Sequence, residues 1–120
     1  MMGRALVIAG AVLGGLGVAL GAFGAHGLKA YADSEALAWW ETGVQYQMWH
    51  ALAALALGLS GRPWVRLPGW LFTAGVVIFS GTLYAMALGA PHWLGAITPV
   101  GGTLMIAGWA VLAIAAARAR

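Results

Sequence analysis

Several polar side chains interrupt the long apolar stretches of this sequence, and they are the groups most able to bind a ligand. An imidazole, amide or phenol inside a bilayer is costly, so each such group needs a hydrogen-bond partner or a function. These groups predict either hydrogen bonds between helices or an outward-opening pocket for a small ligand, such as a quinone, a lipid head group, haem or a metal. The predicted ligand-binding residues are Gln47, His50, Tyr46, Tyr84 and His26.

The histidines differ in what their positions allow. His50 falls near the middle of an apolar stretch, where its ring must bond with something. Haem ligation by His26 and His50 requires both at one depth, but the expected helix register separates them by about 14 Å along the membrane normal. A zinc site at the outer face would need His26, His92 and a carboxylate, and no tight histidine spacing supports it. We therefore predict no metal ligands, and the sequence identifies no cofactor.

No sequence motif typical of an enzyme is present. The chain lacks HExxH, GxSxG, a Walker A loop and a GxGxxG turn after a strand, and it contains no cysteine. No acidic residue lies within the core of a predicted membrane span, so proton-coupled antiport would lack its titrating group. These absences favour a protein without catalytic residues.

The composition is that of an integral membrane protein. Of the 120 residues, 62% are hydrophobic and 8% are charged, against about 45–50% and about 25% in an ordinary soluble domain. A net charge of +3 and a pI near 10 would suggest nucleic acid as the partner of a soluble protein. Here the basic residues lie between apolar stretches, which indicates orientation in a membrane. We expect the lipid bilayer as partner and no nucleic acid.

Four apolar stretches are long enough to cross the roughly 30 Å hydrocarbon core as helices. The predicted fold class is all-α, an integral membrane four-helix bundle that forms a single domain over residues 1–120. The second helix is expected to begin near Ser34 with Asp33 or Ser34 as its N-cap, and Thr98 is expected to cap the fourth. The predicted spans are approximately residues 5–25, 41–59, 69–88 and 99–117.

Basic residues are distributed unequally between the two sides of this predicted bundle. Lys29 and the acidic residues lie on one side, and every arginine lies on the other. Because short cytoplasmic loops carry an excess of lysine and arginine, we predict that both termini are cytoplasmic. The arginines on that side are Arg4, Arg62, Arg66, Arg118 and Arg120.

Glycines recur along the first apolar stretch at spacings of four, three, four and three residues. Such a stripe lets two helix backbones approach closely, and in lipid this contact replaces the hydrophobic effect as the force between helices. The partner helix can belong to the same chain, to a second copy in a homo-oligomer or to a larger membrane complex. The predicted helix-packing residues are Gly10, Gly14, Gly17, Gly21 and Gly24.

Four segments of the sequence together resemble the YgdD-like family, which includes YwdK-like members. They are Gly21-Ala-Phe-Gly-Ala-His-Gly-Leu-Lys29, Thr42-Gly-Val-Gln-Tyr-Gln-Met-Trp-His-Ala-Leu52, Phe79-Ser-Gly-Thr-Leu-Tyr84 and Leu94-Gly-Ala-Ile-Thr-Pro-Val-Gly-Gly102. The resemblance covers essentially the whole chain. It implies a small four-helix protein of the bacterial inner membrane, and it brings no established activity, cofactor or catalytic residue.

Three functional hypotheses remain open. The first is a small membrane binding or accessory protein with a polar pocket in its outer half, around Gln47, His50 and Tyr84. The second is a structural subunit of a larger membrane complex, packed through the glycines of the first span. The third is an oligomeric channel or transporter, which would need a continuous polar stripe that the inner half of the chain lacks.

Overall fold

The computed structural model describes residues 3–119, and these fold into four long helices joined by short connections. The long helices are α1 (Arg4–Ala25), α2 (Ser34–Ser60), α3 (Arg66–Ala87) and α4 (Thr98–Arg118). The connections contain the short 3₁₀ helices η1 (Leu28–Ala30), η2 (Pro63–Val65) and η3 (His92–Ala96). The all-helical class predicted from the sequence is confirmed. The predicted start of α2 near Ser34 is confirmed, and this helix is longer than the membrane span of 41–59 predicted within it.

Three segments are long and apolar enough to cross a membrane: Arg4–Ala30, Pro63–Ala87 and His92–Arg118. α2 is not among them, because polar and charged residues interrupt its apolar sequence. It is nevertheless the longest helix, with 27 residues, or about 40 Å at 1.5 Å per residue. Three of the expected spans are thus supported by length and composition, and the crossing of α2 stays a prediction.

Local sequence accounts for where the helices begin and end. The Asp33 side chain accepts a hydrogen bond from the Ala36 backbone N–H at 2.8 Å, so Asp33 is the N-cap of α2. Gly61 ends the same helix with a φ of 67°, which a side chain would disfavour. Thr98 is the first residue of α4 and makes no cap, contrary to expectation. Its hydroxyl instead donates to Leu94 O at 3.2 Å and lies 2.6 Å from the Thr82 hydroxyl.

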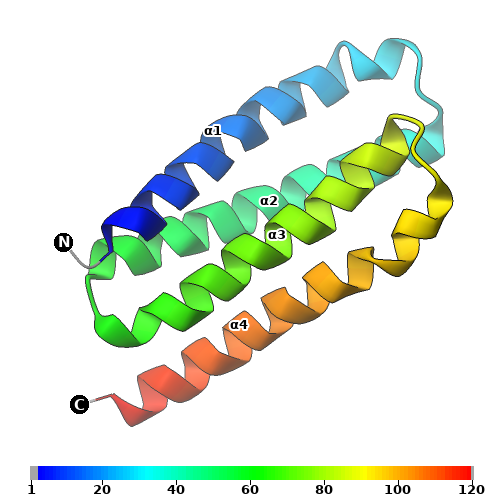
Figure 1. Cartoon of the computed structure of the whole chain (residues 1–120). Coiled ribbons are helices and arrows are strands. Elements are labelled where there is room, and N and C mark those ends of the chain that lie inside the picture. The colour runs from blue at the N-terminus through cyan, green and yellow to red at the C-terminus, as the bar shows by residue number, and fades with distance from the viewer. Residues whose placement is uncertain (1–2, 120) are drawn as a thin grey trace.

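Each helix packs against its neighbour in the chain, in antiparallel order (Figure 1). α1 packs on α2, α2 on α3 and α3 on α4, whereas α1 and α4 do not pack together within the described residues. The expected bundle is therefore open on the side where α1 and α4 would meet. The Cα atoms extend 52 Å in the longest direction, which exceeds the roughly 30 Å of a bilayer core.

Only part of the glycine stripe of α1 faces α2. An added Cβ at Gly10 would lie 2.7 Å from the Leu55 backbone nitrogen, and one at Gly17 would collide with the Met48 sulfur. The third buried member, Gly24, meets the Trp40 ring in the same way. A Cβ at Gly21 would make ordinary contact with α2 at 3.4 Å, and one at Gly14 would meet nothing within 4 Å.

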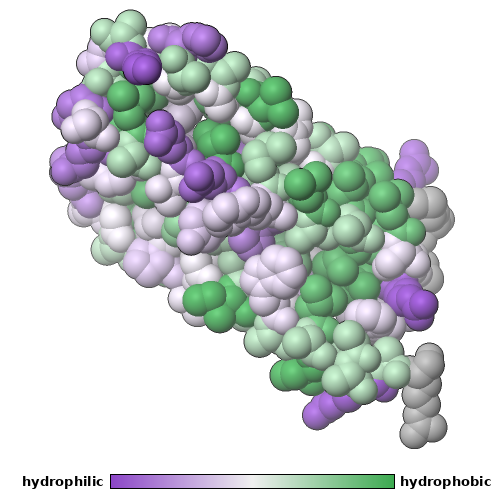
Figure 2. All heavy atoms as spheres, turned by 180° about the vertical axis from the view of Figure 1, so that it is seen from behind, coloured by the Kyte–Doolittle hydropathy of each residue, from purple (hydrophilic) through white to green (hydrophobic). Residues whose placement is uncertain are grey.

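Charged side chains gather at opposite ends of the helices. The ends that carry Arg4, Arg62, Arg66 and Arg118 lie together, because the helices alternate in direction. Lys29 and the acidic residues lie at the other end. Figure 2 shows hydrophilic residues at the two ends of one face and in a band that runs from one end toward its middle, with mostly pale and hydrophobic residues over the rest. Arg120, which was also predicted on the basic side, lies outside the described residues.

Candidate functional site

Gln47 and Tyr84 are joined in a chain of hydrogen bonds that crosses three helices. The Tyr84 hydroxyl of α3 donates to Gln47 Oε1 of α2 at 2.6 Å. Gln47 Nε2 in turn donates to the Leu13 carbonyl of α1 at 2.8 Å. Because Gln47 is only 3% exposed, both of its bonds lie in the interior. The two side chains therefore tie α1, α2 and α3 together at one level.

Other polar groups near this level also form bonds between helices. The Trp40 indole of α2 donates to Leu20 O of α1 at 2.7 Å, and the Ser80 hydroxyl of α3 donates to Gly43 O of α2 at 2.7 Å. Among residues 3–119, no buried side-chain nitrogen or oxygen lacks a hydrogen-bond partner. The geometry thus favours inter-helix bonding, one of the two predicted roles, for Gln47 and Tyr84.

His50 is held through both of its ring nitrogens. Nδ1 lies 2.8 Å from Tyr46 O, one turn earlier in α2, and the Trp109 indole N–H of α4 donates to Nε2 at 3.0 Å. A carbonyl can only accept and an indole N–H can only donate. The proton must therefore be on Nδ1, and the imidazole is neutral with its Nε2 lone pair directed at Trp109.

A groove opens beside this histidine between α2 and α4, with α3 as its floor. Its volume is about 250 Å³, and its lining combines Tyr46 and His50 with Phe79, Gly102, Met105, Ile106 and Trp109. The Tyr46 and Phe79 rings lie 4.7 Å apart between centroids, which closes one wall. Ile106 is 71% exposed and Trp109 is 47% exposed, so the groove opens onto the apolar outer surface of the helices. His50 is thus a buried polar group at the base of an apolar, aromatic groove.

His26 does not join the other predicted site residues. It directly follows the last residue of α1, where it is exposed and its backbone N–H donates to Ala22 O and Phe23 O. His50 and Tyr46 share one groove, while the polar ends of Gln47 and Tyr84 bind each other. No group of three or more metal-ligating side chains occurs in the described part of the chain.

Sequence reasoning did not single out the residue that completes the His50 site. Trp109 lies near the middle of α4, whereas a tryptophan that anchors a span at the membrane surface lies near a helix end. That mid-helix position is the signal that could have identified it. Phe72 of α3 supports the pair, with its ring centroid 4.5 Å from Trp109 and 5.3 Å from His50.

Comparison with known proteins places the chain among small membrane proteins. The family model described as "Protein of unknown function (DUF423)" matches residues 20–102. The UPF0382 membrane protein YwdK of Bacillus subtilis (strain 168) is 46% identical over 120 residues, covering 96% of this chain and 98% of the relative. The UPF0382 inner membrane protein YgdD of Escherichia coli (strain K12) is 38% identical over 124 residues, covering 98% of this chain and 93% of the relative. No solved structure matches the chain.

Proposed function

Since this chain belongs to the DUF423 family of membrane proteins of unknown function, we propose that it binds a small apolar molecule bearing a hydroxyl group. The binding site is the groove beside His50. The observation that carries this proposal is the Trp109 N–H···His50 Nε2 bond, 3.0 Å long, in a groove whose remaining lining is apolar apart from Tyr46. A donor and an acceptor lie side by side there, and each satisfies the other when no ligand is bound.

The chemistry of this pair favours a hydroxyl over other polar groups. A ligand that separates Trp109 from His50 must replace one acceptor and one donor, because a buried polar group left unpaired costs about 1–3 kcal/mol. A single hydroxyl can accept from the indole N–H and donate to Nε2 at the same time. A carbonyl can only accept, so it would leave Nε2 without a donor.

The dimensions and lining of the groove restrict the rest of the ligand. Small-molecule sites are about 300–1,000 Å³, and a volume of about 250 Å³ is just below that range. It suits a single ring or a short hydroxylated segment. The exposed Ile106 and Trp109 mark the open side, along which an apolar tail would extend into lipid. The ligand class is therefore a phenol, quinol or alcohol with an apolar tail.

The groove lies inside the bilayer only if α2 crosses it as the fourth span. Two features of α2 support this crossing. It packs between α1 and α3 along its length, and the polar atoms of Gln47 and His50 bond to neighbouring helices or to its own backbone. Hydrogen bonds to these polar groups lower the free-energy cost of placing α2 in the membrane. We also propose that both termini are cytoplasmic, because the described arginines share one end.

The glycine stripe gives less support to a subunit that packs on other proteins through α1. Gly10, Gly17 and Gly24, the three buried members, face α2 of the same chain. A second protein could reach only the remaining positions. Binding in the groove is therefore the function that the geometry supports best.

The test uses the full chain, labelled with ¹⁵N-histidine and reconstituted in lipid nanodiscs. A short-tailed quinol is titrated in parallel with its dimethyl ether, which has the same ring but no hydroxyl. We expect the quinol to shift the Nε2 resonance of His50 and the ether to leave it unchanged. Trp109→Phe removes one bond to the hydroxyl together with the Trp109–His50 bond that the ligand must break, so quinol affinity should change little, while the Nε2 resonance of the ligand-free protein should shift. Trp70→Phe, at an exposed position outside the groove, should leave binding unchanged.

Two results would reject the proposal. The first is an unchanged Nε2 resonance at saturating quinol. The second is an equal shift with the ether, which would mean that the hydroxyl makes no bond.

A further inference from the structure

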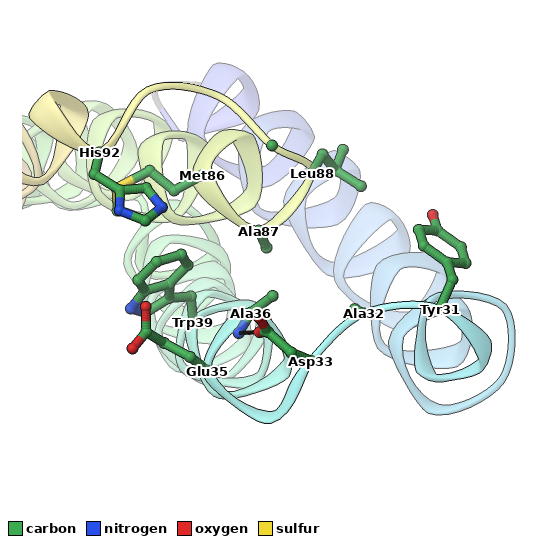
Figure 3. Close-up of a pocket in the computed structure, with 11 residues that line it drawn as sticks. Tyr31, Ala32, Asp33, Glu35, Ala36, Trp39, Met86, Ala87, Leu88 and His92 are labelled. Carbon is green, nitrogen blue, oxygen red and sulfur yellow. Dashed lines mark hydrogen bonds between the residues drawn. The ribbon is translucent and has the colours of Figure 1, made fainter.

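A separate cavity of about 350 Å³ lies at the acidic end of the molecule, away from the His50 groove. It is bounded by the segment that leads into α2, by the end of α3 and by the start of η3. Figure 3 shows Trp39, Glu35 and His92 near one end of this cavity and Tyr31 at the opposite end, with Asp33 between them. The remaining lining side chains that it labels are Ala32, Ala36, Met86, Ala87 and Leu88.

The formal charges around this cavity are negative. Asp33 and Glu35 supply two carboxylates, and the lining contains no lysine or arginine. Lys29, the one lysine of the sequence, is not among the residues that line the cavity. α3 ends at the cavity and α2 begins there, so the partial negative charge of the α3 terminus is opposed by the partial positive charge of the α2 terminus. The carbonyl of Ala87, the last residue of α3, would pair with the N–H of residue 91 if the helix continued. That residue is Pro91, which has no N–H.

Aromatic rings form part of the same wall. The Trp39 and His92 rings meet edge to face, with centroids 5.1 Å apart and an interplanar angle of 83°. Tyr31 adds a phenol ring at the far end. Aromatic faces next to carboxylates attract organic cations, because the ring quadrupole is negative above its plane. A metal ion is disfavoured, since no cluster of three ligating side chains exists in the part of the chain that the structure describes.

We infer that this cavity binds an alkylammonium group. Two sources share that chemistry: the head group of a phospholipid such as phosphatidylethanolamine, and a free water-soluble amine. The cavity lies where α2 begins and α3 ends, beside the exposed Tyr31 and near Trp93 in η3. Exposed aromatic residues at helix ends mark the level of the lipid head groups. The inference depends neither on the His50 groove nor on which side of the membrane this end faces.

Glu35 is the residue to change, because Asp33 also caps α2 through its bond to Ala36 N–H. Glu35→Gln removes the charge and keeps the size of the side chain. Glu41→Gln is the matched control, because Glu41 lies on the same helix but does not line this cavity.

The full chain, labelled with 5-fluorotryptophan, is placed in nanodiscs of phosphatidylglycerol, and the ¹⁹F resonance of Trp39 is assigned with Trp39→Phe. One arm replaces part of the lipid with phosphatidylethanolamine. The other arm adds ethanolammonium chloride to phosphatidylglycerol nanodiscs, with sodium chloride as the ionic-strength control. We expect the Trp39 resonance to shift in at least one arm, and Glu35→Gln to weaken the response about fivefold. Glu41→Gln should respond as the unmodified chain does.

The two arms identify the source of the ammonium group. A shift only with phosphatidylethanolamine assigns the cavity to a lipid head group, and a shift with ethanolammonium assigns it to a soluble amine as well. No shift in either arm would overturn the inference. An equal response in Glu35→Gln and the unmodified chain would also overturn it, because the carboxylate would then have no part in binding.

Discussion

Tyr84 forms a 2.6 Å hydrogen bond with Gln47 inside the apolar part of the molecule. The bond matters because Gln47 is almost fully buried and also donates a hydrogen bond to the Leu13 carbonyl of α1. Loss of the Tyr84 hydroxyl would leave Gln47 Oε1 without a donor. This single side chain therefore tests whether the polar groups of α2 stabilise the packing of the helices.

We expect Tyr84→Phe to lower the free energy of unfolding by about 0.6–2 kcal/mol, the range for hydrogen bonds between membrane helices. The ring is retained, so its contacts with Trp40, 4.6 Å away between centroids, are unaffected. Reversible unfolding in bicelles, followed by circular dichroism, measures the change. Tyr31→Phe is the control, because Tyr31 is 69% exposed. Equal stability of the two variants would contradict the role given to Tyr84.

At the residue scale, the sequence predicts which side chains need a partner but not the partner itself. Gln47 and His50 stand out because amides and imidazoles are rare within apolar stretches. Their partners Leu13 O and Trp109 are 34 and 59 residues away in the chain. Those pairings depend on how neighbouring helices slide and rotate, and one sequence contains no measure of either. Trp109 was missed for this reason.

At the scale of elements, glycines set how closely α1 approaches α2. A Cβ added at Gly10 would lie 2.7 Å from the Leu55 nitrogen and 2.8 Å from the Ala51 oxygen. These are backbone atoms of α2, so a side-chain rotation cannot remove the clash. Gly14, one turn later in the same GxxxG pattern, has no such neighbour within 4 Å.

We expect Gly10→Ala to destabilise the protein by about 1–3 kcal/mol, because extra atoms in a packed contact force the helices apart. Gly14→Ala should be neutral or stabilising, because alanine favours a helix over glycine by roughly 0.5–1 kcal/mol. The helix preference of alanine applies to both variants. The difference between their free energies of unfolding therefore measures the clash at Gly10. Reversible unfolding in bicelles measures the stability of both variants. Equal free energies of unfolding would contradict this geometry.

The sequence predicts helix boundaries, but it predicts only some of the contacts between helices. Asp33 could be named as a cap because its type and its place before an apolar helix determine that role. The stripe in α1 was visible because its glycines are regularly spaced. The close contact between α3 and α4 at Gly75 and Gly101 was missed. These two glycines belong to different helices and form no pattern along the chain.

At the scale of the whole molecule, charge and shape indicate how the protein lies in a bilayer. The described arginines are at one end, and the carboxylates and Lys29 are at the other. Many large hydrophobic side chains are exposed between these ends, and part of this apolar surface is seen in Figure 2. Composition predicts this membrane location well, because 62% hydrophobic residues cannot be buried in a soluble domain of this size. The open arrangement of α1 and α4 was not predictable, since it depends on which helix faces meet.

The arrangement in the membrane depends on α2, the one long helix whose composition does not by itself indicate a span. If α2 crosses, the η1 connection and the η2 connection lie on opposite sides of the membrane. If it lies along the surface, they lie on the same side, and the groove beside His50 is not at the depth that we propose. The chain contains no cysteine, so single cysteines can report the side of each connection without a background signal.

The most direct measurement is labelling of Ala30→Cys, Ser60→Cys and Ala96→Cys in intact cells with a membrane-impermeant maleimide. All three positions are exposed at helix ends or in connections. We predict that Ala30→Cys and Ala96→Cys are labelled from outside, and that Ser60→Cys is labelled only after the membrane is permeabilised. Labelling of Ser60→Cys in intact cells, or of Ala30→Cys and Ser60→Cys from the same side, would contradict the four-span arrangement with cytoplasmic termini.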